Sequence, residues 1–312
     1  MIEQLLPAGV VVVEAFEDVP GEPVFPGEED LVVNAVESRR REFVTARRCA
    51  REAVAKLGRA PAPIRRGSNR EPLWPPGLVG SITHTTGFRG AAVAPLSILA
   101  SVGIDTEQDR PLPDGVEAAI TVGSEPEMLA SLARAFPLTH WGRLLFSAKE
   151  AVYKAWYPLT GRWLGFKHAC LTIDPAGEFA ATLLIDGART DGEPPLTELQ
   201  GRFLIAHGLV ATAVTVPPTL LSNVPICSGL RAGVGPRARA SENPRECEAR
   251  HARDARRSVR SLPAGRRATP RPSPTLSVKH EPRRTPAGPF AFTLAGIART
   301  GRIRQGKTAS RA

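Results

Sequence analysis

Apolar residues recur every three or four positions along residues 30–57, which is the spacing of one face of an α-helix. Gly58 follows the last of them, and glycine commonly terminates helices. Residues 141–156 show the same period, and their apolar side chains fall within about 60° of Trp141 around a helical axis. The pattern therefore predicts two long amphipathic helices, over 30–57 and 141–156.

Shorter apolar or alternating runs predict β-strands between and after these helices. Helices mixed with largely antiparallel strand pairs indicate an α+β fold. The predicted strand regions are VGSITHTTGFRGAAVAP (79–95, a strand, a turn and a strand), ILASVGIDTE (98–107), ACLTID (169–174), ATLLID (181–186) and GRFLIAHGLVATAVTV (201–216).

The chain has 312 residues, of which 42% are apolar, and a formal net charge of +10. Residues 218–312 hold 20 of the 41 Lys and Arg residues but only 5 of the 31 Asp and Glu residues, which leaves 21 basic and 26 acidic residues before them. The positive charge therefore belongs to the C-terminal part alone. The acidic remainder gives no support to nucleic-acid binding by the folded part.

Residues 218–312 lose the periodic pattern and are rich in Arg, Pro, Ser and Ala. This composition predicts a disordered basic extension, which would bind polyanions nonspecifically. Residues 301–308 match the phosphate-loop pattern GxxxxGK[ST], but only four residues follow them. Because that loop needs a helix after it, we do not interpret the match as a nucleotide site.

The four cysteines lie far apart, without a CxxC pair or a His at metal spacing. Neither a disulfide framework nor a zinc site is indicated, and a reducing cytoplasm fits best. Glu3 stands where a signal peptide needs positive charge. No stretch approaches about 18 apolar residues, so we expect no membrane span.

The second predicted helix carries Glu150 and Lys154 four residues apart, the spacing of an ordinary solvent-exposed salt bridge. Phe146 and Tyr153 flank these charges and lie outside the apolar stripe. Aromatic residues in that position suggest that the charged face meets another surface or a ligand.

Asp105 and Glu107 in SVGIDTE would point to the same face of a strand, because side chains alternate along it. Their Cα atoms would lie about 6.5–7 Å apart, so both carboxylates could converge on one small cation. Mg²⁺ suits two or three protein carboxylates together with substrate phosphates. The alternative interpretation is a strand that runs into a polar loop.

His84, at the end of a short strand, could donate a hydrogen bond to an anion, although a single histidine is commonly a surface residue. One face of the first predicted helix carries a row of arginines, which alone would be interpreted as a solvated face. The row consists of Arg39, Arg40, Arg47 and Arg51.

Taken in order, these segments resemble the 4′-phosphopantetheinyl transferases of the surfactin and enterobactin type, and most closely the actinobacterial members. The pair [V/I]GIDxE and [F/W]SxKExxxK, about 40 residues apart, is specific to that family. The resemblance covers roughly residues 30–216. It rests on RRREFVTARRCAR, GSITHTTGFRGAAVA, SVGIDTEQ, FSAKEAVYKAWYPLTGRWLGF and GRFLIAHGLVATAV.

The resemblance implies transfer of the phosphopantetheine arm of coenzyme A to a serine of an acyl or peptidyl carrier protein, with release of adenosine 3′,5′-bisphosphate. It also implies a pseudo-twofold pair of α+β halves in a working monomer. We expect an N-terminal half at 1–103, a C-terminal half at 104–217, and the extension at 218–312.

By similarity, Asp105, Glu107 and Glu150 surround a Mg²⁺ that bridges the pyrophosphate. Lys154 would contact the phosphate, and Glu150 is the candidate base for the serine proton. Lys149 would assist nucleotide binding.

Arg40, Arg47 and His84 match family positions at the 3′-phosphate and adenosine end of coenzyme A. The family usually carries Lys-Gly before a Glu-Pro or Lys-Pro step, where this chain has Ser68-Asn69-Arg70-Glu71-Pro72. A cation is therefore missing at Asn69, and we expect Arg70 to replace it.

Two other functions are kept as alternatives. The basic extension favours a nucleic-acid-binding protein. DNA binding that survives deletion of residues 218–312 would support this alternative, whereas binding confined to the extension would leave the transferase interpretation untouched. The carboxylates would also suit a Mg²⁺-dependent nucleotide phosphohydrolase, which would act without a protein acceptor.

Overall fold

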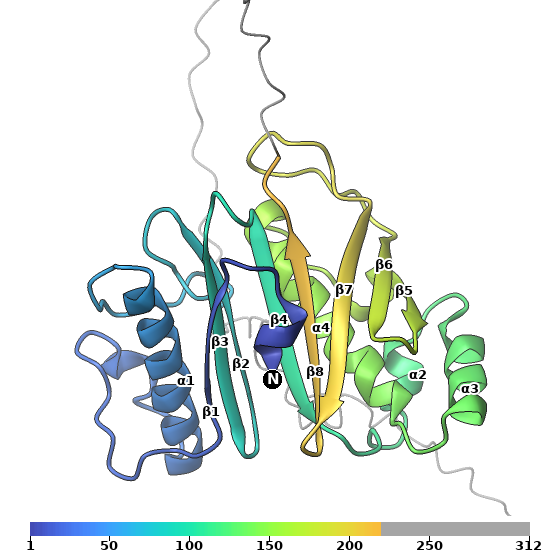
Figure 1. Ribbon diagram of the computed structural model, residues 1–312, viewed down its shortest axis with the longest axis horizontal. Helices are drawn as coiled ribbons and strands as arrows, with labels where there is room; N and C mark the ends of the chain where they lie inside the picture. Colours follow the sequence, from blue (N-terminus) through green and yellow to red (C-terminus); the bar gives the residue numbers. More distant parts are fainter. Residues whose placement is uncertain (220–312) are drawn as a thin grey trace, which may run out of the picture. The chain divides into compact units, whose positions relative to one another are not determined.

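Two antiparallel sheets, each with one long helix packed on it, make up residues 1–219, the part of the chain that the computed structural model describes (Figure 1). The first sheet has the order β1-β3-β2 and the second β4-β8-β7-β6-β5. The strands are β1 (Val11–Ala15), β2 (Leu78–Thr85), β3 (Phe88–Pro95), β4 (Ser101–Gln108), β5 (Ala169–Asp174), β6 (Glu178–Leu183), β7 (Glu198–Ala206) and β8 (Leu209–Val216).

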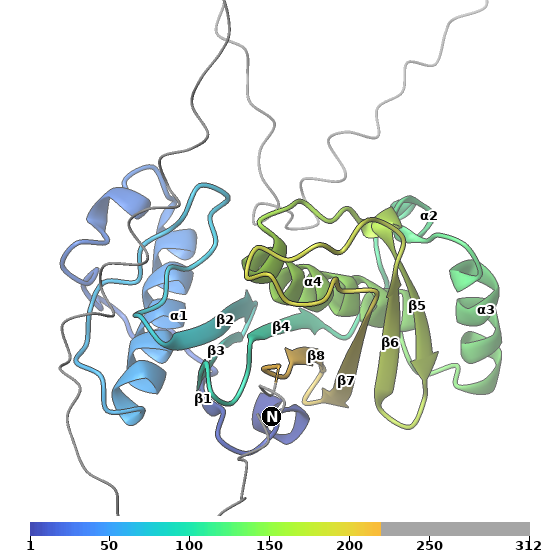
Figure 2. The ribbon, with the colours of Figure 1, turned by 90° about the horizontal axis from the view of Figure 1, so that it is seen from above.

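The helices of the described residues confirm a mixed α+β fold. Figure 2 shows α1 and α4 on one side of the strands and the N-terminal turn η1 on the other. The α-helices are α1 (Glu37–Lys56), α2 (Val116–Ile120), α3 (Glu125–Ala135) and α4 (Trp141–Thr160), and the 3₁₀ turns are η1 (Ile2–Leu5), η2 (Glu29–Leu31) and η3 (Phe166–His168).

The two sheets meet where β2 lies beside β4 (Figure 1). The backbone N–H of Ile104 in β4 donates to Ser81 Oγ in β2 at 3.1 Å. Each half begins with a strand, continues with a long helix that packs on the sheet, and ends in antiparallel strands. The second sheet starts at Ser101, so the boundary that we predict between residues 103 and 104 falls inside β4.

The second predicted helix is present and extends one turn further, to Thr160, where Gly161 with φ 63° ends it. The first predicted helix starts later than expected, at Glu37 instead of residue 30. Val36 has an extended backbone, and the side chains of Val33 and Val36 are 73% and 70% exposed. The apolar period over residues 30–36 therefore does not mark a buried helical face.

The apolar pattern did not predict the helices α2 and α3. It also predicted the strand β6 three residues further along the chain than the structure shows. In α3 only Glu125, Leu129 and Leu132 are buried, which leaves a weak apolar period. Strand β6 covers 178–183 instead of 181–186, because the chain leaves the sheet at Leu184, whose side chain is 51% exposed.

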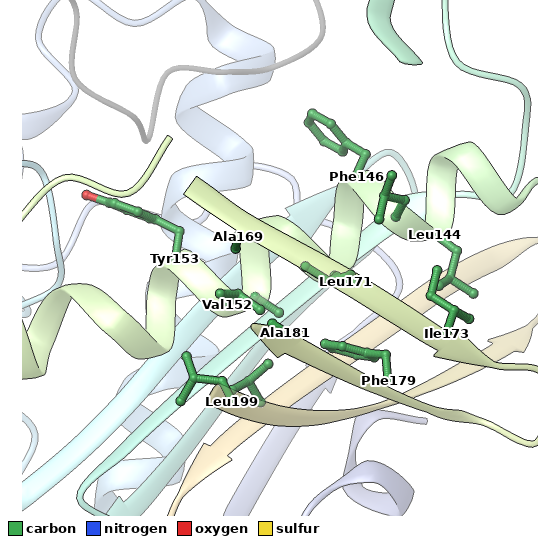
Figure 3. Close-up of a cluster of buried hydrophobic side chains, with 14 of the residues drawn as sticks. Leu144, Phe146, Val152, Tyr153, Ala169, Leu171, Ile173, Phe179, Ala181 and Leu199 are labelled. Atoms are coloured by element: carbon green, nitrogen blue, oxygen red, sulfur yellow. The ribbon is translucent and has the colours of Figure 1, made fainter. Parts of the chain in front are cut away.

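Phe146 and Tyr153 do not border an open face, as we expected from the helical projection. Both side chains are buried, and Figure 3 shows them directed away from the centre of the core around Val152. Phe146 stacks on Phe166 with ring centroids 5.4 Å apart, and Tyr153 lies 5.2 Å from Trp163. Two aromatic residues of the segment that follows α4, Phe166 and Trp163, therefore cover these rings.

Four apolar clusters stabilise the described residues, and the smallest consists of Val32, Phe43 and Val44. One joins α4 to the second sheet, and another joins α1 to the first sheet. The third lies between the sheets, where Ile2 and Leu5 of η1 pack with Phe88 of β3 and with Leu209 and Ala211 of β8. Burial of η1 thus ties the N-terminus to both sheets.

Gly103 sets the distance between β4 and α4. A Cβ atom at this position would lie 2.0 Å from the carbonyl oxygen of Ala151 and 2.6 Å from the backbone nitrogen of Ala155. Next to it, Ser101 Oγ donates to the carbonyl of Ala155 at 2.8 Å. The strand backbone therefore rests directly on the helix backbone.

Residues 220–312 lie outside the described part of the chain, and with them most of the predicted basic extension and the GxxxxGKT match. Among residues 1–219 no helix combines the length and the apolar character needed to cross a bilayer.

We expect Gly103→Ala to lower the free energy of unfolding by about 1–3 kcal/mol, because the new methyl group forces β4 and α4 apart. Urea unfolding followed by circular dichroism measures this change. Gly165→Ala is the control, since its Cβ would lie 3.5 Å from the nearest atom and its φ is −78°. Equal stability losses in both variants would contradict the packing argument.

Candidate active site

Strand β4 and helix α4 bring the predicted acidic residues into one neighbourhood. Asp105 is buried, and its Oδ1 accepts a hydrogen bond from Lys154 Nζ at 2.7 Å. Lys154 also donates to the carbonyl of Ile104 at 3.0 Å. The other carboxylate oxygen of Asp105, Oδ2, is buried without a hydrogen-bond partner among the described residues.

Negative charge is crowded at this place. Burial and the charge of Asp105 raise the pKa of Glu150 to about 8, although Lys154 opposes the shift. The same two causes raise the pKa of Glu107, which Arg143 opposes through a contact of 3.2 Å to Glu107 Oε2. Each carboxylate thus carries a cost that an added cation would relieve.

Residues 1–219 contain no group of three His, Cys, Asp or Glu side chains that could hold a metal ion as they stand. The donor set nevertheless fits a small divalent cation, on two grounds. The Oδ2 atom of Asp105 is buried with no partner in the described chain, and the three carboxylates repel one another. Carboxylate oxygens are also the ligands that Mg²⁺ prefers.

Arg143 holds the segment that follows β4. Its side chain is 1% exposed, and its guanidinium donates to the carbonyls of Arg110 at 3.1 Å and Pro111 at 2.8 Å as well as to Glu107. No specific role for Arg143 could be predicted from the sequence, because on a helical projection it lies with the other charges of the helix. It fixes Glu107 and the backbone beyond it.

The ammonium group of Lys149, which we expected to assist nucleotide binding, contacts acceptors of the chain itself. Its Nζ donates to Glu125 Oε2 at 2.8 Å and is surrounded by the carbonyls of Ile120, Phe166 and Ala169 at 2.7–3.0 Å. A protonated amine has three hydrogens, so these four acceptors leave none for a ligand. Lys149 therefore stabilises the packing of α4 against α3 and the segment after α4.

A positively charged group faces this site from the first half. Arg39 Nη1 lies 2.7 Å from Nε2 of His84 at the end of β2. Burial and the charges of Arg39 and Lys154 lower the pKa of His84 well below its ordinary value. The imidazole is therefore neutral at pH 7. His84 lies in β2, which packs beside β4, so the basic and acidic groups are neighbours.

Two further guanidinium groups lie over the ring of Phe43. The Cζ atom of Arg47 lies 3.9 Å from the centre of the Phe43 ring, and that of Arg66 lies 5.1 Å from it. Burial and the charge of Arg66 lower the pKa of Arg47 to about 9. Neither arginine has an ion pair with a carboxylate of the described residues. Like charges held together in this way favour an anion between them.

Arg39 and Arg40 lie on different faces of α1. Arg39, and not Arg40, contacts His84, because Arg39, Phe43 and Arg47 form one i, i+4, i+8 row. Arg40 is exposed and lines a separate hollow on the other side of this row. Arg51 is paired with buried Glu28 at 3.0 Å and serves the fold.

Arg70, which we expected to replace a missing cation, is exposed in the loop before β2 with φ 69°. Arg66, four residues earlier, is the residue that lies over Phe43. Sequence reasoning missed Arg39 as a specific contact and Arg66 altogether. The i, i+4, i+8 spacing of Arg39, Phe43 and Arg47 could have indicated the role of Arg39. Arg66 lies in a loop, where no periodic pattern could indicate its contact with Phe43.

A narrow hollow adjoins Glu150 on the side away from β4. It is lined on one side by α4 and on the other by the segment after it, and one of its lining side chains, Trp163, is partly exposed. The lining residues include Lys149, Glu150, Tyr153, Trp163, Leu164 and Phe166.

Comparisons with known proteins agree with this arrangement. A family model described as the 4′-phosphopantetheinyl transferase N-terminal domain matches residues 27–94, and the 4′-phosphopantetheinyl transferase superfamily model matches residues 101–198. The chain is similar to 4′-phosphopantetheinyl transferase Svp of Streptomyces mobaraensis, with 51% identity over 69% of this chain and 89% of that protein.

Two further relatives have the same kind of name. One is 4′-phosphopantetheinyl transferase PptT of Mycobacterium tuberculosis, with 45% identity over 69% of this chain and 98% of that protein. The other is enterobactin synthase component D of Salmonella typhimurium, with 34% identity over 52% of this chain and 70% of that protein. The family resemblance noted in the sequence is thereby confirmed.

We expect Lys149→Met to lower the free energy of unfolding by about 3–5 kcal/mol, because it leaves the fully buried carboxylate of Glu125 without its cation. Urea unfolding is the measurement. Lys167→Met, at an exposed position nearby, should change stability by less than about 0.5 kcal/mol. If the two variants unfold at the same urea concentration, Lys149 is not the structural residue described above.

Proposed function

The chain belongs to the 4′-phosphopantetheinyl transferase superfamily, and on that premise we propose which of its residues carry out the transfer. The enzyme moves the phosphopantetheine arm of coenzyme A to a serine of a carrier protein. A bond forms between the serine oxygen and phosphorus, the pyrophosphate bond breaks, and adenosine 3′,5′-bisphosphate leaves. The observation that carries the assignment of residues is Lys154, which contacts Asp105 and whose charge also reaches His84.

The adenosine end of coenzyme A would bind to the first half. Arg39, Arg47 and Arg66 supply the positive charge, the neutral imidazole of His84 lies beside Arg39, and the 3′-phosphate is the dianion that would lie between them. Guanidinium groups suit forked contacts to phosphate oxygens, and their mutual repulsion falls when the anion arrives. The lowered pKa values of Arg47 and Arg66 support this interpretation.

The pyrophosphate would lie between the two halves. Asp105, Glu107 and Glu150 are the residues proposed to hold Mg²⁺, which supplies neutralisation of the charge that builds up on the leaving phosphate. Lys154 would contact the same leaving group with a fixed positive charge, a form of stabilisation that needs no reorganisation during the reaction. Its second contact, to the backbone of β4, keeps the ammonium group in place.

Glu150 is the proposed acceptor for the serine proton, directly or through a water molecule. Its side chain adjoins both the acidic group and the hollow formed by α4 and the segment after it. We propose that the pantetheine arm lies in that hollow, since its wall contains the aromatic rings of Tyr153, Trp163 and Phe166. The phosphorus and the serine would then meet beside Glu150.

The biological setting follows as part of the same proposal. The acceptors would be acyl or peptidyl carrier proteins of fatty acid, polyketide or nonribosomal peptide synthesis. A monomer would suffice, because both charged groups come from one chain. Cys49 and Cys170 are free thiols, which suits a reducing cytoplasm.

We expect Asp105→Asn and Glu150→Gln each to reduce the transfer rate by about 10²- to 10³-fold, because they remove charge that acts on the reacting phosphate. The assay contains coenzyme A, Mg²⁺ and an apo carrier protein, and mass spectrometry detects the added arm. Removal of divalent cations with a chelator should stop the reaction, and added Mg²⁺ should restore it.

The matched control is a chain that ends after Pro218. It retains all matched regions of the family models and should keep full activity. An Asp105→Asn variant with full activity would contradict the proposed metal ligands. Hydrolysis of coenzyme A without a carrier protein would instead favour a phosphohydrolase.

Arg39→Ala and Arg40→Ala separate the two neighbouring arginines. We expect Arg39→Ala to raise KM for coenzyme A by about 10- to 100-fold, because it removes charged hydrogen bonds to the 3′-phosphate. Arg40→Ala should change KM by less than about twofold, since its side chain is exposed. Steady-state kinetics measures both KM values, and a larger effect of Arg40→Ala would contradict the assignment of Arg39 to the phosphate site.

A further inference from the structure

The loop of residues 66–72 connects the two charged groups in an unexpected way. It lies between α1 and β2 in the chain and rises between α1 and α4 (Figure 2). Arg66 pairs with Pro72 as an isolated antiparallel bridge, and the N–H of Gly67 donates to the carbonyl of Glu71 at 2.9 Å. The loop is therefore a short hairpin with its base at Arg66 and its tip at residues 68–70.

The tip of this hairpin touches the helix of the other half. The side-chain amide of Asn69 donates a hydrogen bond to the hydroxyl of Tyr157 in α4. Tyr157 lies three residues after Lys154, and its ring lies 5.9 Å from that of Tyr153. Tyr153 in turn lines the hollow beside Glu150, so Asn69 contacts a residue whose ring lies next to the wall of that hollow.

The base of the hairpin belongs to the positively charged group. Arg66 lies over Phe43 with Arg47, and the charge of Arg39 contributes to lowering its pKa. One hairpin thus carries a phosphate-binding arginine at one end and a contact to the catalytic helix at the other.

Hydrogen bonds join the tip of the hairpin to its two arms. The N–H of Asn69 donates to Glu71 Oε2 at 2.9 Å, and the N–H of Arg70 donates to the carbonyl of Gly67 at 3.1 Å. Glu71 Oε1 would lie 1.9 Å from a Cβ atom at Gly67, so the two arms are in contact. Arg70 itself has φ 69°, which fixes a tight turn.

We propose that Asn69 is a positioning residue, whose hydrogen bond to Tyr157 holds Arg66 against the 3′-phosphate of coenzyme A. The proposal rests on the proposed function of the positively charged group. Asn69 and Tyr157 need not touch the substrate for this.

A merely structural role would weaken binding of every substrate alike, whereas this role depends on one phosphate. The discriminating probe is dephospho-coenzyme A, which lacks only the 3′-phosphate. We expect Asn69→Ala to raise KM for coenzyme A by about three- to tenfold, as loss of one hydrogen bond would. The kcat should stay within about twofold, and KM for dephospho-coenzyme A should also stay within about twofold of its wild-type value.

Tyr157→Phe removes the partner hydroxyl and keeps the ring, so it should reproduce the effect. The double variant should be no worse than either single variant, because both remove the same interaction. Gln200→Ala, an exposed amide on β7, is the control and should behave as wild type. Circular dichroism and urea unfolding of each variant show whether the fold is retained.

Three results would overturn the proposal. One is an equal rise in KM for both substrates in Asn69→Ala. Another is a double variant whose effects multiply. The third is a wild-type enzyme with equal KM for the two substrates, together with an Arg39→Ala substitution that changes both KM values equally. This result would also contradict the proposed phosphate site. If Arg39→Ala distinguishes them and Asn69→Ala does not, the proposal for Asn69 fails while the proposed function stands.

Discussion

The direct contact between the backbones of β4 and α4 is the constraint on which the site depends. A side chain larger than hydrogen at Gly103 would push the strand away from the helix. Asp105, two residues further along the strand, can form its 2.7 Å contact with Lys154 only because that distance is kept. The position of the acidic group is therefore set by the core beneath it, where Ala151 and Ala155 also present small side chains.

The two halves hold opposite charges, and each half leaves its own charge incompletely neutralised. Carboxylates are concentrated between β4 and α4, and guanidinium groups are concentrated around Phe43 and His84. Ion pairs occur in both regions, since Lys154 pairs with Asp105 and Arg39 pairs with Glu42. Among the described residues, however, Oδ2 of Asp105 keeps no hydrogen-bond partner, and Arg47 and Arg66 have no ion pair with a carboxylate. Arg51 with Glu28 and Lys149 with Glu125, in contrast, form buried pairs away from these regions. A substrate with a pyrophosphate and a remote phosphate complements both regions at once.

Much of this could be predicted from the sequence, and the failures have physical causes. Alternation along a strand placed Asp105 and Glu107 on one face, and helical spacing placed Glu150 with Lys154, because both patterns are local. The surroundings of Lys149 could not be predicted in this way. The residues that contact it are distant in the chain, at 120–125 and 166–169. Phe146 and Tyr153 lay off the apolar stripe, as the projection said, but only the folded chain shows that Phe166 and Trp163 cover them.

The place of η1 has a consequence for how the protein is made. Ile2 and Leu5 complete an apolar cluster with Leu209 and Ala211, which lie some two hundred residues later in the chain. The ribosome synthesises Ile2 and Leu5 long before Leu209 and Ala211. The apolar cluster between the sheets therefore cannot be completed until β8 has left the exit tunnel. The first half can collapse early on α1, but its apolar underside must wait for β8. The nascent chain therefore spends most of its synthesis with that underside available to chaperones.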